Sequence, residues 1–354
     1  MSPDEYGNWQ ESFLDEPLLK RGWVVQERIL SKRALYFGSE QVFWECYEIT
    51  RCETHQKTLQ SLNERSTIEV GHVWKGLTGH DRYASTWKND TQQLFEDWYY
   101  LVEMYTSCEL TYSRDKLVAM SGIVKDMRQH LVRLKCESTR YLAGIWQQEL
   151  PQALLWDPEG GEHYRRPEIY RAPSWSWASI DGVIGYRSSF LYSTDGLEIL
   201  SSVIGAWVTP VNRGDDTGEV SDGMITLAGI LIIANLGPLP ESNGCITERA
   251  IIDLRDYEDD TLLCETKTMS KTYWATVTFD TQDDNFDQIF CLPIMKKVFH
   301  CEGRFSRHII EGLVVTRVDD GNYRRVGHFT ITTETEDEYR SLLKNASRGH
   351  IDII

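Results

Sequence analysis

The spacing of apolar residues changes along this 354-residue chain, from a helical to a strand-like pattern near residue 170. Before that point, apolar residues recur every three or four positions, as on one face of an amphipathic helix. After it, apolar and polar residues tend to alternate, as on strands with one buried face. Helices followed by a run of strands are typical of the α+β class. We therefore expect an α+β fold whose helices lie mostly in the first half.

Residues 51–158 are expected to form a mainly helical region, irregular up to about residue 90. Three helices are expected after that point, the second beginning at an N-cap Ser113 and the third ending before Pro151. Their apolar stripes are Leu94, Trp98, Leu101, Val102 and Tyr105 in the first, Leu117, Met120, Val124, Met127 and Leu131 in the second, and Leu142, Ile145, Trp146 and Leu150 in the third.

Residues 159–354 are expected to form an antiparallel β-rich domain with a C-terminal helix at 334–346. Strand-like runs occupy residues 200–208, 224–234, 273–279, 289–294, 308–317 and 323–331. Because no helices separate these runs, neighbouring strands should pair in antiparallel fashion. The resulting sheet should fold into a β-sandwich or a partly closed barrel.

Composition narrows the classes of partner. The chain has 37 basic and 54 acidic residues, a formal net charge of −17, which disfavours binding to nucleic acid. The longest apolar stretch is too short to span a membrane, and a secretory signal is not expected. Eight cysteines stand at irregular spacing without a Cys-x-x-Cys pair, so we expect free thiols, no metal site and a cytoplasmic location.

The main candidate site lies in a helix expected at residues 21–30. Trp23, Gln26, Glu27 and Leu30 fall on one helical stripe. A carboxylate within a core-facing stripe is costly to bury, so Glu27 should face a cleft or meet a cation such as Arg28. Glu27 is therefore the candidate catalytic residue, with Trp23, Gln26 and Arg28 as candidate ligand-binding neighbours. The alternative is a structural ion pair that locks the helix to its sheet.

Two tryptophans form a second candidate ligand site. Trp175 and Trp177 alternate with serines, as on a strand, and could offer an aromatic platform to a sugar or a nucleotide. Burial in the core is the alternative interpretation. Arg324 and Arg325, in a later strand-like run, are expected to form an exposed pair.

Several motifs occur in a recognisable order. Arg21-Gly-Trp23, Gln26-Glu-Arg28, Leu30-Ser31 and Tyr36-Phe-Gly38 resemble the last signature block of the HET (heterokaryon incompatibility) domain of filamentous fungi. The family's first two blocks are not found in the sequence. The following motifs resemble the region that often follows a HET domain: Ser113–Gly122, Tyr141–Trp146, Leu154-Leu-Trp156, Arg171–Ser179 and Glu311–Val315.

The resemblance implies that residues 1–50 are a C-terminal remnant of a HET domain, a partial α/β unit similar in fold to TIR domains. Intact relatives take part in fungal nonself recognition and programmed cell death. The expected function is therefore a non-catalytic interaction or regulatory module that binds protein partners, without a cofactor. A homo-oligomer would cover a sheet edge left by missing strands.

Two other functions stay open at this level. The first is a TIR-like enzyme that cleaves NAD at a residual site around Glu27, although fold likeness alone does not assign Glu27 that role. The second is a ligand-binding β-domain built around Trp175 and Trp177.

Overall fold

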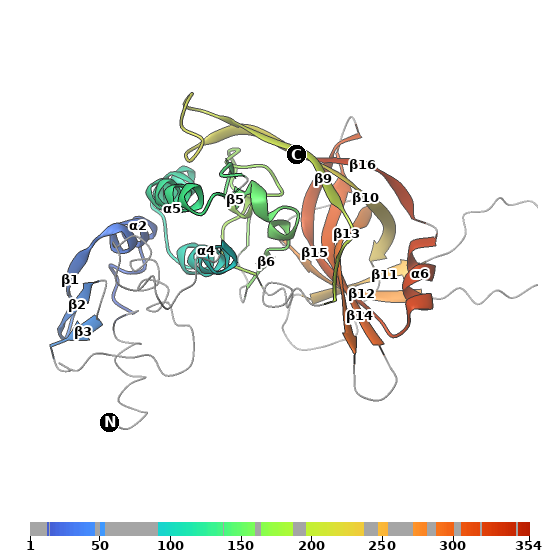
Figure 1. Ribbon diagram of the computed structural model, residues 1–354, viewed down its shortest axis with the longest axis horizontal. Coiled ribbons are helices and arrows are strands. Elements are labelled where there is room, and N and C mark those ends of the chain that lie inside the picture. The colour runs from blue at the N-terminus through green and yellow to red at the C-terminus, as the bar shows by residue number, and fades with distance from the viewer. Residues whose placement is uncertain are drawn as a thin grey trace, which may run out of the picture. The chain divides into compact units, whose positions relative to one another are not determined.

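The computed structural model describes residues 13, 15–46, 50–53, 91–136, 138–159, 164–186, 196–236, 247–253, 272–281, 288–300, 306–318, 321–344 and 346–354. They fall into two compact units, shown in Figure 1. Unit 1 contains Met1–Gln148, Gly182–Tyr186 and Pro210–Val220, and unit 2 contains Glu149–Asp181, Arg187–Thr209 and Ser221–Ile354. Helices and sheets are both present, so the expected α+β class is confirmed.

Unit 1 begins with a helix followed by a small sheet. Helix α2 (Gly22–Leu30) precedes strands β1 (Arg33–Phe37), β2 (Val42–Cys46) and β3 (Thr50–Cys52), which pair in antiparallel order β1-β2-β3 (Figure 1). The turn expected at Gly38 is present, since its N–H donates to the carbonyl of Gln41 at 3.0 Å. Because side chains alternate along a strand, one face of this sheet packs inward while the other points outward. The inward cluster consists of Phe13, Tyr36, Phe43 and Cys52.

Two of the three expected helices of the middle region are present. Helix α4 (Thr91–Thr106) buries its predicted stripe, and α5 (Ser121–Arg133) buries Val124, Met127 and Leu131. The start of the second helix was predicted wrongly. Two 3₁₀ turns, η1 (Ser113–Lys116) and η2 (Val118–Met120), precede α5, and no side-chain cap forms at Tyr112, the residue before η1.

The third predicted helix is wrong. Residues 141–149 form a hairpin of β4 (Tyr141–Leu142) and β5 (Ile145–Trp146), followed by η3 (Gln147–Glu149). Ala143 and Gly144 have φ angles of 45° and 106°, a left-handed backbone that ends any helix there. Burial was predicted correctly, since Trp146 packs edge-on against Trp98 with ring centroids 5.7 Å apart.

Short elements lie between this hairpin and the large sheet. They are η4 (Gln152–Leu154), β6 (Asp157–Pro158), η5 (Trp177–Ser179) and β7 (Ile184–Gly185). The strand predicted around Ser174–Ser179 is wrong: the chain turns, and η5 begins after Ser176. The Ser176 hydroxyl accepts a hydrogen bond from the N–H of Ala178 at 3.0 Å. A serine that caps its own turn competes with strand pairing.

The remaining strands form one large mixed sheet in unit 2. They are β8 (Leu197–Ile199), β9 (Ser202–Pro210), β10 (Val220–Leu236), β11 (Thr247–Asp253), β12 (Thr272–Phe279), β13 (Ile289–His300), β14 (Ser306–Arg317), β15 (Tyr323–Thr333) and β16 (Ser347–Ile353). Helix α6 (Glu336–Lys344) lies between β15 and β16 in the sequence.

Six of these strands close into a barrel. Antiparallel pairing runs from β10 through β11, β12, β15, β14 and β13 and back to β10. Two arrangements were predicted, a β-sandwich and a partly closed barrel, and the closed ring corresponds to the barrel. Strand β16 pairs with the first part of β10 and makes one parallel pairing with β15, which the antiparallel prediction did not include.

Side chains fill the barrel, and helix α6 completes its core. Alternate residues of the ring strands point inward, among them Val277, Val314 and Phe329. Tyr339 and Leu342 of α6 belong to the same buried cluster. The barrel of unit 2 therefore depends on a helix that follows its last ring strand (Figure 1).

Candidate functional site

Glu27 lies on the exposed side of α2, contrary to the sequence prediction. The buried side of the helix consists of Val24, Val25, Arg28 and Ile29. Trp23 is 36 % exposed. The predicted stripe therefore faces the wrong way, because the inward-facing charged residue of α2 is the arginine rather than the glutamate. Glu27 is not the buried carboxylate that the sequence analysis inferred.

The buried carboxylate that meets Arg28 is Glu45 of β2. Arg28 Nη2 donates to Glu45 Oε1 at 3.0 Å and Arg28 Nε donates to Oε2 at 3.1 Å. The hydroxyl of Tyr36 donates to the same Oε2 at 2.9 Å. Burial lowers the pKa of Arg28, but the nearby Glu45 outweighs it, so the pKa is raised overall. Burial, reinforced by Glu45, also raises the pKa of Tyr36.

This cluster corresponds to the structural alternative of the sequence analysis, with a different carboxylate. Sequence reasoning missed Glu45. The alternation along β2 could have found it, because Glu45 is two residues from the buried Phe43 and therefore shares its face.

Trp23 and Gln26 hold α2 against the helical part of unit 1. Trp23 Nε1 donates to Asp115 Oδ2 at 3.2 Å, and the N–H of Gly122 donates to Gln26 Oε1 at 2.6 Å. A Cβ atom at Gly122 would lie 2.6 Å from that same oxygen, so a larger residue there would displace the end of the Gln26 side chain. The two motifs that begin at Arg21 and at Ser113 in the sequence are thus in direct contact.

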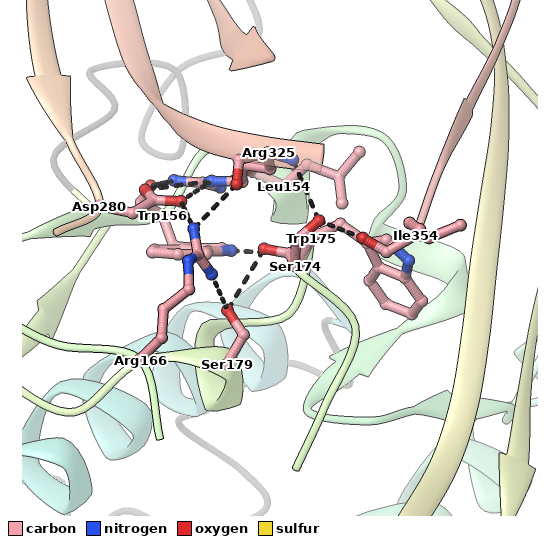
Figure 2. A network of polar contacts seen from close by, with 9 residues as sticks. All are labelled: Leu154, Trp156, Arg166, Ser174, Trp175, Ser179, Asp280, Arg325 and Ile354. Carbon is pink, nitrogen blue, oxygen red and sulfur yellow. Dashed lines mark hydrogen bonds and ion pairs between the residues drawn. The ribbon is translucent and has the colours of Figure 1, made fainter. Parts of the chain in front are cut away.

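A second polar cluster lies in unit 2 around Arg325 of β15, and Figure 2 shows it. Arg325 and Asp280 are both completely buried. Arg325 Nη2 donates to Asp280 Oδ1 at 3.1 Å and to the carbonyl of Trp156 at 2.6 Å. Arg325 Nη1 donates to the carbonyl of Leu154. The prediction of an exposed arginine pair is therefore wrong for Arg325.

A second guanidinium and two serines extend this cluster. Arg166 Nη2 lies 3.5 Å from Asp280 Oδ2 and donates to the carbonyl of Arg325 at 2.9 Å. The Ser174 hydroxyl accepts from the N–H of Arg325 at 3.0 Å and donates to the carbonyl of Ile354. Ser179 accepts from Arg166 Nη1 at 3.3 Å. One carboxylate thus serves two arginines (Figure 2).

Trp175 and Trp177 are completely buried, so the prediction of an aromatic ligand platform is wrong. Their burial matches the alternative interpretation as core residues. Trp156 Nε1 donates to the carbonyl of Trp175 at 3.0 Å, and the guanidinium of Arg325 lies over the Trp156 ring. The tryptophans therefore pack the segment 154–179 against the barrel within unit 2.

The chemistry of the Arg325 cluster favours a structural role. General acid–base catalysis needs a group whose pKa lies near the working pH. Burial lowers the pKa of Arg325, while Asp280 favours its charged form. The guanidinium is held by Asp280 and two main-chain carbonyls, away from solvent. We conclude that the cluster joins residues 154–179 to β15.

Within the described part of the chain, no group of three or more His, Cys, Asp or Glu side chains could hold a metal ion. Among the described helices, none has the length and hydrophobicity of a membrane span.

The outward face of β1 and β2 carries large apolar side chains. Phe37 is 80 % exposed, Leu35 is 51 % exposed and Trp44 is 36 % exposed. Leu35 pairs with Trp44 across the two strands, and Phe37 pairs with the half-exposed Val42. We call these four residues the apolar face. Contiguous exposed apolar side chains on a folded protein commonly mark an interaction surface.

Comparisons with protein-family models, with curated proteins and with solved structures gave no match for this chain.

Proposed function

We propose that this chain is a protein-interaction module rather than an enzyme, and that it is related to the HET-domain proteins of filamentous fungi. The observation that carries the proposal is the apolar face, Leu35, Phe37, Val42 and Trp44, exposed on a sheet whose other side is packed. Exposed apolar side chains of this size favour aggregation, so a folded protein that keeps them at its surface commonly uses them for binding. In this proposal the module works in the cytoplasm, and residues 1–50 are a TIR-like HET remnant.

The candidate catalytic and ligand-binding residues support an interaction module because most of them have roles within the fold. Arg28 binds Glu45, and Gln26 binds the main chain of Gly122. Trp175 and Trp177 are core residues.

The motifs behind the HET resemblance also lie in contact with one another. Residues 21–28 touch 113–122 in unit 1, and residues 154–156 touch 171–179 in unit 2. Such contacts support the proposal that these motifs belong to one type of folded region.

Site-specific photo-crosslinking in fungal cells tests the proposal. A photoreactive phenylalanine analogue would replace Phe37, and in a matched control it would replace Ile169, which is 82 % exposed in unit 2. We expect discrete protein adducts from position 37 that are absent from position 169. Equal yields of diffuse adducts at both positions, or none at position 37, would refute an interaction role for the apolar face.

The rival enzymatic function needs its own assay. The purified chain would be incubated with NAD and the products separated by chromatography. We expect no cleavage above that of a heat-denatured sample. Cleavage that is lost in Glu27→Gln and retained in Glu45→Gln would establish the NAD-cleaving function instead.

A further inference from the structure

The apolar face has a different charge at each of its two ends. At one end, where β1 begins, Lys32 and Arg33 are exposed. At the other end, the turn between β1 and β2 exposes Glu40, and Glu53 lies beside Val42, with its N–H donating to the Val42 carbonyl at 2.9 Å. The surface is therefore basic at one end, apolar in the middle and acidic at the other end.

The acidic end continues around the turn. A depression of about 200 Å³ is lined there by Asp15, Glu16, Pro17, Ser39, Glu40, Gln41 and Phe43. Glu16 is engaged by Ser39, whose N–H donates to Glu16 Oε1 at 2.8 Å, and Asp15 lies 3.2 Å from Lys20 Nζ. Glu40 is the exposed carboxylate in the turn itself.

We infer that a second copy of this chain binds the apolar face, stacking its own apolar face upon it; this inference rests on the proposed interaction function. The two-fold axis would lie between the two faces and cross the strands at Leu35 and Trp44. Rotation about this axis reverses the strand direction, so Arg33 of each copy meets the turn that carries the partner's Glu40. A surface that is basic at one end and acidic at the other complements itself in this way.

The same rotation matches the side chains of the apolar face. Leu35 lies at the axis and meets its own equivalent. Arg33 and Phe37 lie on β1 two residues before and two residues after Leu35. The rotation therefore places the guanidinium of Arg33 over the partner's Phe37 ring, a favourable cation–π arrangement. Arg51 pairs with Trp44 from the outer strand β3, so it lies at the level of the axis and approaches its own equivalent. At the rim its long side chain can turn into solvent, which keeps the two guanidinium groups apart.

The small size of the face makes the predicted dimer weak. Strands β1 and β2 have five residues each and β3 has three, so spacings of about 4.8 Å between strands and about 3.4 Å per residue give a face of at most roughly 10 Å by 17 Å. Stable interfaces bury about 1,600 Å² in total, well above what this face provides. We therefore expect a weak dimer whose population depends on concentration.

Sedimentation equilibrium of the full chain tests the dimer. We expect a monomer–dimer equilibrium, weakened at least tenfold by Phe37→Lys, which places a second positive charge beside the partner's Arg33, and unchanged by the control Ile169→Lys. Circular dichroism would verify that both variants are folded, and Leu35→Lys would give a second disruption of the face. A chain that stays monomeric at several hundred micromolar, or a dimer that Phe37→Lys leaves intact, would overturn the inference.

A charge exchange tests the orientation of the two copies. Arg33→Glu and Glu40→Arg each place like charges together in a homodimer, so each variant alone should dimerise less than the unaltered chain. A mixture of the two variants restores opposite charges at both contacts, and we expect it to form a mixed dimer. Failure of the mixture to associate better than either variant alone would contradict the antiparallel stacking.

The photo-crosslinks from position 37 separate the two proposals. An adduct with the mass of two copies supports both of them. An adduct with a different protein, and none with a second copy, would keep the interaction function while refuting the second copy as the occupant. Absence of any adduct specific to position 37 would refute both.

Discussion

The guanidinium carbon of Arg325 lies 3.3 Å from the centroid of the Trp156 ring, and both side chains are completely buried. Three kinds of group compensate the buried charge: the Asp280 carboxylate, main-chain carbonyls and an aromatic face. Removal of one member of such a cluster leaves the others buried without a partner, which costs more than the cluster gains by forming.

Arg325→Met should therefore destabilise unit 2 strongly. Asp280 would keep Arg166, at 3.5 Å, and the carbonyls of Leu154 and Trp156 would lose a donor. We expect a loss of about 3 to 5 kcal/mol in the free energy of unfolding, measured by urea denaturation. Arg340→Met is the control, because Arg340 forms an exposed pair with Glu336, for which a loss below about 1 kcal/mol is expected. A similar small loss for Arg325→Met would contradict the structural role of the cluster.

Glu45→Gln should loosen unit 1, whereas Glu27→Gln should not. Replacing Glu45 leaves Arg28 buried without a carboxylate. Cys52 is buried in the adjoining cluster, so its thiol reports local opening. We expect its labelling rate to rise about 100-fold in Glu45→Gln, as a local loss of about 3 kcal/mol implies. Equal labelling rates in the two variants would show that Arg28 does not depend on Glu45.

Gln26→Ala should weaken the contact between α2 and α5. The N–H of Gly122 would lose its acceptor, at an expected cost of about 1 kcal/mol. Hydrogen exchange at the Gly122 amide measures this directly, and it should accelerate about fivefold. Glu27→Ala alters the next residue on the exposed side of α2 and should leave the exchange unchanged. Acceleration in both variants would instead indicate general fraying of the helix.

Stability should fall below neutral pH in part because of His130. Burial lowers the pKa of His130 below its ordinary value of 6.5; Asp126 opposes this and Arg133 adds to it. The unfolded chain therefore binds a proton at a higher pH than the folded chain. The resulting stabilisation is present above pH 6.5 and is lost as the pH falls through the folded pKa.

Thermal unfolding between pH 7.5 and pH 5.5 checks the role of His130. His130→Gln should flatten the pH dependence of the melting temperature in that range. An equally steep dependence in His130→Gln would assign it to other groups.

Elements with one strong pattern were predictable from the sequence. The spacing of apolar residues in α4 and α5 fitted a helix, and the two apolar runs on either side of Gly38 fitted a hairpin. Residues 141–150 did not, because the spacing of Leu142, Ile145 and Trp146 fits both a helix and a tight hairpin. The left-handed backbone at Ala143 and Gly144 decides between them, and it depends on tertiary packing.

The buried charges were not predictable, because each depends on a partner remote in sequence. Arg325 follows another arginine on β15, and the pattern alone does not tell which of the two points inward. Its partner Asp280 comes directly after β12, 45 positions before Arg325 in the sequence. The error at Glu27 has a similar origin, since Arg28 faces inward to meet Glu45, which lies 17 positions further along the chain on β2.

The pairing of β16 with β10, together with the bond from Ser174 to Ile354, has a consequence for how the protein is made. Residues 347–354 must leave the ribosome before unit 2 can finish folding. Until then, the edge of β10 that pairs with β16 has no partner strand, while more than a hundred residues are added to the chain. Nascent strands in that state associate readily with other chains, so production of this protein should depend strongly on chaperones.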